Sequence, residues 1–238
     1  MANNTVYNSS KYIFFAYQAA ELFKLSRENQ LKIIDRINEG YLRNNEKFNI
    51  MKGKRIEDPE SFNLSLGFPI DSSSCYLYLF LEKSETFDMD LSNCKSMKRE
   101  IFQGYEFYFP RKADESFLKF NSLDIKGILG FKPHHSYPNG KTIEPTSFTT
   151  FSPKLGSLML PMLEKHYATL FEVDNYIVEV IVEHKLCEYY SNHHNYAEIK
   201  RFVVPVDYKS DESEIIPGLI LNKPMTISVM IKNHDSAI

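Results

Sequence analysis

One segment, residues 176–185, constrains the fold more than any other, because it reads Tyr-Ile-Val-Glu-Val-Ile-Val-Glu-His-Lys. Half of these ten positions are β-branched, which is typical of a pleated, partly buried strand. Because side chains of a strand alternate between its faces, one face carries Tyr176, Val178, Val180, Val182 and His184, and we expect it to lie in the core. The other face carries Ile177, Glu179, Ile181, Glu183 and Lys185. That mixture of apolar and charged residues favours an antiparallel or mixed sheet with one partly solvated face.

The rest of the chain predicts helices before and within a set of strands. Apolar residues recur at helical spacing over 12–23 and again over 31–41, after the candidate N-cap Ser26, which predicts an N-terminal helical hairpin. A helix is also expected over 158–170, and strands over segments such as 75–81. We therefore predict an α+β fold, with the hairpin packed on a mostly antiparallel or mixed β-sheet. Residues 1–238 are expected to form a single domain, in which 9–45 can form a helical subdomain.

The expected location is the cytoplasm or another reducing intracellular compartment. No secretion signal is apparent, and the longest apolar run, Cys75–Leu81, is far shorter than the ~20 residues that span a bilayer, so no membrane contact is predicted. The three cysteines, Cys75, Cys94 and Cys187, are odd in number and widely spaced. This count argues against a disulfide framework.

The N-terminal part of the chain is basic. Residues 1–56 hold ten Lys and Arg against five Asp and Glu, although the whole chain has a formal net charge of −3. Cations and apolar side chains alternate in one stretch, which gives the candidate binding residues Phe48, Met51, Lys52, Lys54 and Arg55. Such a stretch can bind nucleic acid through phosphate contacts and base stacking, or a protein through its apolar anchors. A solvated helix face followed by a connector would also explain it. Because the remainder of the chain is acidic, a protein partner is favoured over nucleic acid bound through residues 47–55.

A second candidate site combines Asp174, Glu183 and Lys185. An acid followed by an acid-X-Lys at a strand end is the arrangement of metal-dependent nucleases, in which two carboxylates hold Mg²⁺ and the lysine positions water or phosphate. In a regular strand Asp174 and Glu183 would lie on opposite faces, so a bend would be needed to bring their carboxylates together. The simpler interpretation of Glu183 and Lys185 is an exposed strand end with both residues on one face. Mg²⁺ is expected only under this alternative, and no other cofactor is predicted.

Histidines form the third candidate group, with six near the segments that can converge: His134, His135, His166, His184, His193 and His194. None of their spacings matches a zinc module, so we predict no metal site. Cys187 follows His184 by three residues without a supporting catalytic motif. Residues 132–153 read as a long irregular stretch, a length that in compact domains is often functional, and a ligand near it stays an open alternative.

These observations favour a non-enzymatic binding protein that engages a macromolecular partner. The alternative is a metal-dependent nuclease or nucleic-acid-binding protein that uses the acid-X-Lys strand end.

Overall fold

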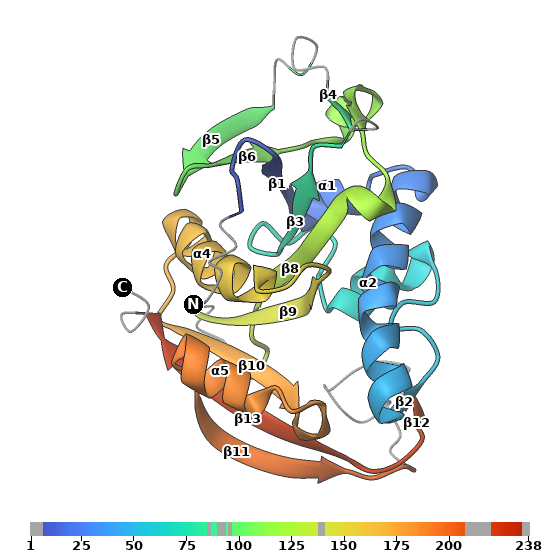
Figure 1. Cartoon of the computed structure of the whole chain (residues 1–238), viewed down its shortest axis with the longest axis vertical. Helices are drawn as coiled ribbons and strands as arrows, with labels where there is room; N and C mark the ends of the chain where they lie inside the picture. The colour runs from blue at the N-terminus through green and yellow to red at the C-terminus, as the bar shows by residue number, and fades with distance from the viewer. Residues whose placement is uncertain are drawn as a thin grey trace.

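A computed structural model describes residues 7–84, 87–89, 94, 97–137, 141–207 and 220–234. Its centre is a large mixed sheet with helices on both faces (Figure 1). In the described residues this sheet has nine strands in the order β11-β13-β10-β9-β8-β3-β1-β6-β5. The predicted α+β class is confirmed.

The sheet strands are β1 (Tyr12–Gln18), β3 (Tyr76–Glu82), β5 (Lys98–Phe102), β6 (Tyr105–Phe109), β8 (Ile125–Pro133), β9 (Thr142–Thr150), β10 (Asn175–Ile181), β11 (Ala197–Val204) and β13 (Met225–Asn233). Two short pairs lie outside the sheet: β2 (Met51–Lys52) with β12 (Ile220–Leu221), and β4 (Asp88–Met89) with β7 (Leu118–Lys119). The α-helices are α1 (Ala19–Leu22), α2 (Arg27–Phe48), α3 (Phe62–Leu66), α4 (Leu155–Leu170) and α5 (Cys187–His194). The 3₁₀ turns are η1 (Pro59–Ser61), η2 (Lys112–Phe117), η3 (Ser122–Asp124) and η4 (Val182–His184). None of the described helices has the length and apolar content needed to cross a membrane.

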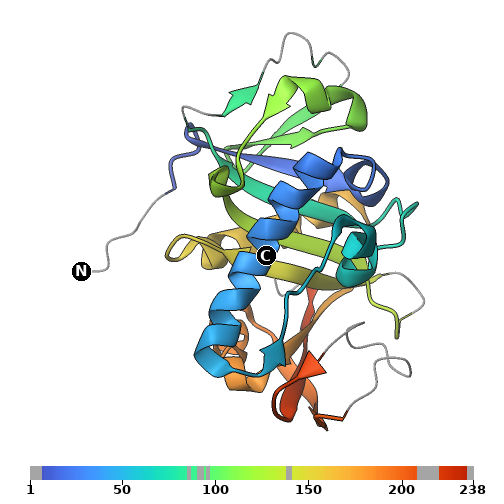
Figure 2. The ribbon, with the colours of Figure 1, turned by 90° about the vertical axis from the view of Figure 1, so that its right-hand side faces the viewer.

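The two faces of the sheet hold separate hydrophobic cores. Figure 2 shows α2 running across the strands on one face, where Ile33 and Ile37 pack with Phe15 of β1. On the other face α4 packs Met159 and Leu163 into the second core. Because side chains alternate along each strand, α2 and α4 cover opposite sides of the same strands.

The predicted N-terminal helical hairpin is wrong in its first half. Residues 12–18 form β1, an interior strand between β3 and β6. Both faces of β1 are covered, so apolar residues fill nearly every position, and a helical spacing can be picked out of such a continuous run. The second half is a helix with the predicted start, because α2 begins after Ser26, whose Oγ accepts a hydrogen bond from the backbone N–H of Asn29 (3.4 Å). Its end was predicted too early, since α2 continues past residue 41 to Phe48.

Residues 176–185 contain an interior strand, but a shorter one than predicted. β10 lies between β9 and β13 and ends at Ile181, where η4 begins, and Lys185 then adopts a left-handed conformation (φ 60°). Tyr176, Val178 and Val180 lie in the core beside α4, as expected. On the opposite face Ile177 is buried in a third cluster, so that face is not simply solvated.

Candidate functional site

The parallel neighbours β9 and β10 separate after a short contact. Only Asn175 with Thr142 and Tyr176 with Ile143 are paired in the described residues, whereas β10 and β13 are paired along the whole of β10. Beyond Ile143 and Tyr176 the facing edges of the two strands have no strand partner among the residues that the structure describes. Between them lies a cavity of about 820 Å³, lined by residues 144–150 of β9 and 178–181 of β10. We call it the gap cavity.

A bulge in β9 accompanies this separation. Ile128 of β8 is opposite Thr149 and Gly130 is opposite Thr146, so that two residues of β9, Ser147 and Phe148, oppose one residue of β8. Ser147 has φ +52°, and its buried hydroxyl has no hydrogen-bond partner in the described residues. Bulges bend and twist a strand, and a non-glycine residue at positive φ is uncommon within a strand. The bulge therefore offers a local reason for β9 to turn away from β10.

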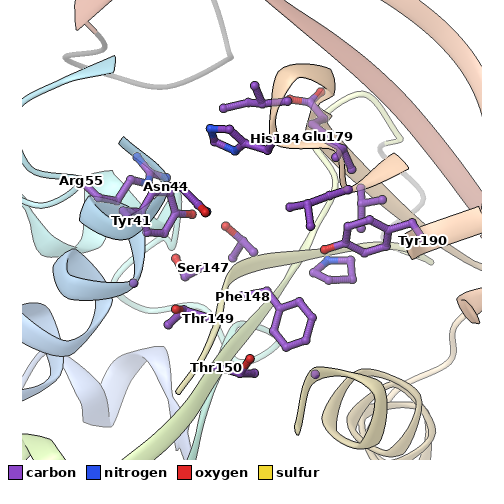
Figure 3. Close-up of a pocket in the computed structure, with 18 of the residues that line it drawn as sticks. Tyr41, Asn44, Arg55, Ser147, Phe148, Thr149, Thr150, Glu179, His184 and Tyr190 are labelled. Atoms are coloured by element: carbon purple, nitrogen blue, oxygen red, sulfur yellow. The ribbon is translucent and has the colours of Figure 1, made fainter. Parts of the chain in front are cut away.

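The gap cavity is lined from both sides of the sheet. Figure 3 shows Tyr41 and Asn44 of α2 on one wall, with Glu179 and His184 across from them. The first turn of α4, and Tyr189 and Tyr190 of α5, line it from the opposite face of the sheet. The gap between the strands thus connects the α2 face with the α4 face.

Positive charge predominates in this lining. The cationic side chains are Arg43, Lys47, Arg55, Lys132 and Lys154, and the carboxylates are Glu144 and Glu179. Lys132 and Glu144 form an ion pair with each other (3.3 Å). Because a concave, partly buried lining concentrates its own field, the gap cavity favours an anionic ligand.

The N-terminus of α4 also borders the gap cavity. Lys154 adopts a left-handed conformation (φ 62°) just before the helix begins at Leu155. A Cβ added to Gly156 would lie 2.8 Å from the Tyr189 hydroxyl oxygen, so α4 lies close to α5 at this position. The backbone N–H groups of a helix start attract anions. Burial raises the pKa of the Tyr189 hydroxyl, which keeps it protonated near neutral pH.

The six predicted histidines do not converge. His184 lines the gap cavity, lies tilted against the Phe48 ring with 5.1 Å between ring centroids, and has a pKa lowered by burial. His166 lies away from the cavity, between Tyr78 and Glu100, and stacks on Phe107. His193 and His194 belong to the end of α5 and do not line the cavity.

His134, His135 and Glu144 offer ligand atoms within 4.8 Å of one another. However, Nδ1 of His134 accepts a hydrogen bond from the backbone N–H of Ser136 (3.2 Å). In the neutral ring Nε2 then carries the proton. Neither nitrogen of the buried His134 therefore has a lone pair available for a metal ion in this conformation.

The nuclease arrangement predicted from Asp174, Glu183 and Lys185 is wrong in its geometry. Asp174 precedes β10 and the other two residues follow it, so the length of a seven-residue strand, roughly 20 Å, separates them. The Glu183 carboxylate accepts hydrogen bonds from the backbone N–H of Thr226 (2.9 and 3.1 Å). The acid-X-Lys motif lies on η4 and the residue after it, because the strand ends four residues earlier than the sequence pattern suggested.

The predicted binding stretch divides into three parts. Met51 is buried in the third hydrophobic cluster, and the partly buried Phe48 packs against that cluster. Lys52 and Lys54 are exposed. Arg55 lines the gap cavity. Binding of a protein or a nucleic acid through this stretch stays a prediction.

Sequence reasoning missed the strand that matters most to this site. The stretch read as irregular, 132–153, contains β9, whose sequence Thr-Ile-Glu-Pro-Thr-Ser-Phe-Thr-Thr gives a weak strand signal because of Pro145. Proline is tolerated at the edge of a sheet, and the β10-facing edge of β9 is open at that position. No motif or spacing in the sequence indicated that Tyr189 would line the site.

Comparison with known proteins identifies the family. The model of the family "Sporulation protein RMD6" matches residues 7–234. The chain belongs to the sporulation protein RMD6 family. A relative in that family, sporulation protein RMD6 of Saccharomyces cerevisiae (strain ATCC 204508 / S288c), is 24% identical over 183 residues, which cover 75% of this chain and 77% of the relative.

Solved structures show which fold this member of the RMD6 family has. It is similar to the spermidine N-acetyltransferase from Vibrio cholerae in complex with CoA and spermine, with a TM-score of 0.53 and 10% identity. The match covers 96% of this chain and 98% of the other. At this identity the similarity establishes a shared fold alone.

Proposed function

We propose that this protein is an acyl-coenzyme A-dependent N-acyltransferase that binds its donor in the gap cavity. The observation that carries the proposal is the parallel contact of β9 and β10, which stops after two residue pairs and opens a cavity through the sheet. A solved protein of the same fold, the spermidine N-acetyltransferase, was captured with CoA and spermine, which supports the assignment of donor and acceptor classes.

The unpaired strand edges suit the pantetheine arm of the donor. Beyond Ile143 the β10-facing edge of β9 has no strand partner in the described residues, so its backbone polar groups, other than the N–H that Pro145 lacks, can pair with a ligand. An extended ligand with amide groups can satisfy such an edge as an added strand would. The pantetheine arm has two amides in an extended chain and fits this role.

The start of α4 suits the pyrophosphate of the donor. Its first-turn N–H groups have no intrahelical acceptors, and Lys154 precedes them. Gly156 has no side chain that would cover these groups. A helix start with these properties is a general phosphate site.

Acyl transfer then needs two proton movements. The amine nitrogen of the acceptor attacks the thioester carbonyl carbon, the C–N bond forms, and the C–S bond breaks. We assign Glu179, half-buried on β10, to take the proton that the nitrogen loses, and Tyr189 to give its proton to the departing thiolate. The products are an amide and free CoA; Glu179 then releases its proton to solvent, and Tyr189 regains a proton from solvent.

Ligand binding tests the first part of the proposal. Acetyl-CoA at about 100 times its dissociation constant should stabilise the protein by about 2.7 kcal/mol. For a chain of this size that raises Tm by roughly 5–10 °C in a thermal melt. Gly156→Val should remove most of this shift, whereas Thr169→Val at the exposed far end of α4 should keep it. The absence of a shift with either acetyl-CoA or CoA would contradict the proposal.

Thiol release tests the second part. Acetyl-CoA and an amine should yield free CoA, detected with a thiol reagent, and Tyr189→Phe should lower kcat by about 10²-fold or more while the acetyl-CoA melting shift remains. The non-enzymatic binding protein favoured from sequence makes a different prediction. It would release no thiol from acetyl-CoA with any amine.

A further inference from the structure

One wall of the gap cavity carries cations without partner carboxylates. Arg43 and Lys47 of α2 and Arg55 after it, here called the α2 wall, line the cavity and form no ion pair within the described residues. Arg43 donates a hydrogen bond to the backbone oxygen of Thr150 (2.8 Å). The ammonium group of Lys47 lies over the ring of Phe48. Earlier in the same helix the pattern differs, since Arg36 is paired with Glu39.

Arg55 is the most informative member of the α2 wall. Its Nε and Nη1 atoms are buried, and neither has a hydrogen-bond partner in the described residues. Its guanidinium carbon lies 5.7 Å from the centre of the Tyr41 ring. A buried N–H without an acceptor costs free energy. The guanidinium fork matches a carboxylate or a phosphate, which would accept two hydrogen bonds from it.

The donor does not account for this charge. The start of α4, assigned above to the pyrophosphate, lies on the opposite face of the sheet from α2. Figure 3 shows Arg55 with Tyr41 and Asn44 on one side of the cavity and Glu179 across from them. An acceptor that reaches Glu179 from the α2 face therefore passes the α2 wall. A polycation would be repelled there.

We propose that the acceptor is a small amine that also carries an anionic group, a carboxylate or a phosphate, and that Arg55 binds this group. This inference rests on the proposed function. The amine lies toward Glu179 and the anionic group lies against the α2 wall, and the acyl transfer itself proceeds by the step described above.

The test compares acceptors that share a primary amine and differ in charge. Thiol release from acetyl-CoA would be measured with β-alanine, glucosamine 6-phosphate, glucosamine and spermidine. At least one anionic amine should have a kcat/KM more than 10-fold above those of glucosamine and spermidine. A higher kcat/KM for β-alanine than for glucosamine 6-phosphate would indicate that the anionic group is a carboxylate, and the reverse would indicate a phosphate. A preference for spermidine or glucosamine would overturn the proposal.

Variants separate Arg55 from general charge effects. Arg55→Gln should raise KM for the anionic amine by about 10- to 100-fold, as expected for a lost charge-assisted pair, and leave KM for acetyl-CoA unchanged. The matched control Lys52→Gln removes an exposed charge from the same stretch outside the cavity and should change neither value. If Arg55→Gln weakens acetyl-CoA instead, Arg55 belongs to the donor and the proposal is wrong.

A binding measurement keeps the two proposals separable. With CoA present, β-alanine or glucosamine 6-phosphate should raise Tm of the wild type, and the same compound should not raise Tm of Arg55→Gln. If this shift occurs without thiol release from any amine, anion binding at Arg55 stands and the acyltransferase proposal fails. If neither the shift nor thiol release occurs, both proposals are refuted.

Discussion

Replacement of Gly40 by alanine sets two effects of opposite sign against each other. Gly40 lies inside α2 and faces β9. Alanine is a better helix former than glycine by about 1 kcal/mol, so propensity alone would stabilise the variant. A Cβ built at Gly40 would, however, lie 1.9 Å from Oγ1 and 2.7 Å from Cβ of Thr149.

The contact should win this competition. Carbon atoms pack at about 3.5–4.0 Å, so the new methyl group overlaps Thr149 by roughly 1 Å or more. The Thr149 hydroxyl can rotate away, but its Cβ is fixed to the backbone of β9. α2 must therefore move, and overpacking of this kind costs about 1–3 kcal/mol. After the gain in propensity, we expect Gly40→Ala to lower the free energy of unfolding by on the order of 1 kcal/mol.

Urea and thermal unfolding of the purified protein measure this difference. Asp35→Ala, at an exposed position of the same helix, is the matched control and should be neutral or slightly stabilising, because only propensity acts there. Gly40 and Thr149 both line the gap cavity, so the acetyl-CoA melting shift should also decrease in Gly40→Ala. A Gly40→Ala variant as stable as the wild type, with an unchanged ligand shift, would refute the close approach of α2 to β9.

Two further predictions concern buried charge and pH. Lys232→Met should cost about 3–5 kcal/mol because it leaves Glu164, which is fully buried, without its cationic partner, and Lys232→Met with Glu164→Gln should cost less than the single change in a double-mutant cycle. Burial alone would raise the pKa of Glu115, but hydrogen bonds from Lys112 and Ser26 outweigh it and lower this pKa to about 2. The stabilisation from Glu115 is therefore present above its unfolded-state pKa of about 4.3 and is lost as the pH falls toward 2. Urea melts at pH 7 and pH 3 should show a smaller acid-dependent loss for Glu115→Gln than for the wild type.

Local sequence signals predicted an element correctly where each of its faces has a single kind of surrounding, either core or solvent. The Ser26 cap predicts the start of α2, and the alternation in 176–181 places Val178 and Val180 in the core. The same alternation placed Glu179 on the less apolar face, and that face is in part the lining of the gap cavity. A charged residue in a buried strand, here Glu179, was thus a signal for a site. The same pattern is equally typical of a strand with one solvated face.

The remaining features depend on relations between distant segments. β1 is covered on both faces, which removes the alternation that distinguishes a strand from a helix. The separation of β9 from β10 involves a bulge at Ser147, and serine at positive φ has no distinctive sequence pattern. Arg55 was a candidate because of its charge, but only the folded chain shows that its neighbours Phe48 and Met51 point elsewhere.

The short parallel contact between β9 and β10 also divides the sheet mechanically. On one side lie β10, β13 and β11, and on the other side lie the remaining six strands. Within the described part of the sheet, only two residue pairs join the two blocks, while the core around α4 is shared by both. Rotation of one block against the other about this contact would change the width of the opening while nearly all ladder hydrogen bonds stay intact. A ligand seated between the blocks would tie them together, so amide hydrogen exchange in residues 177–181 and 144–150 should slow in concert when it binds.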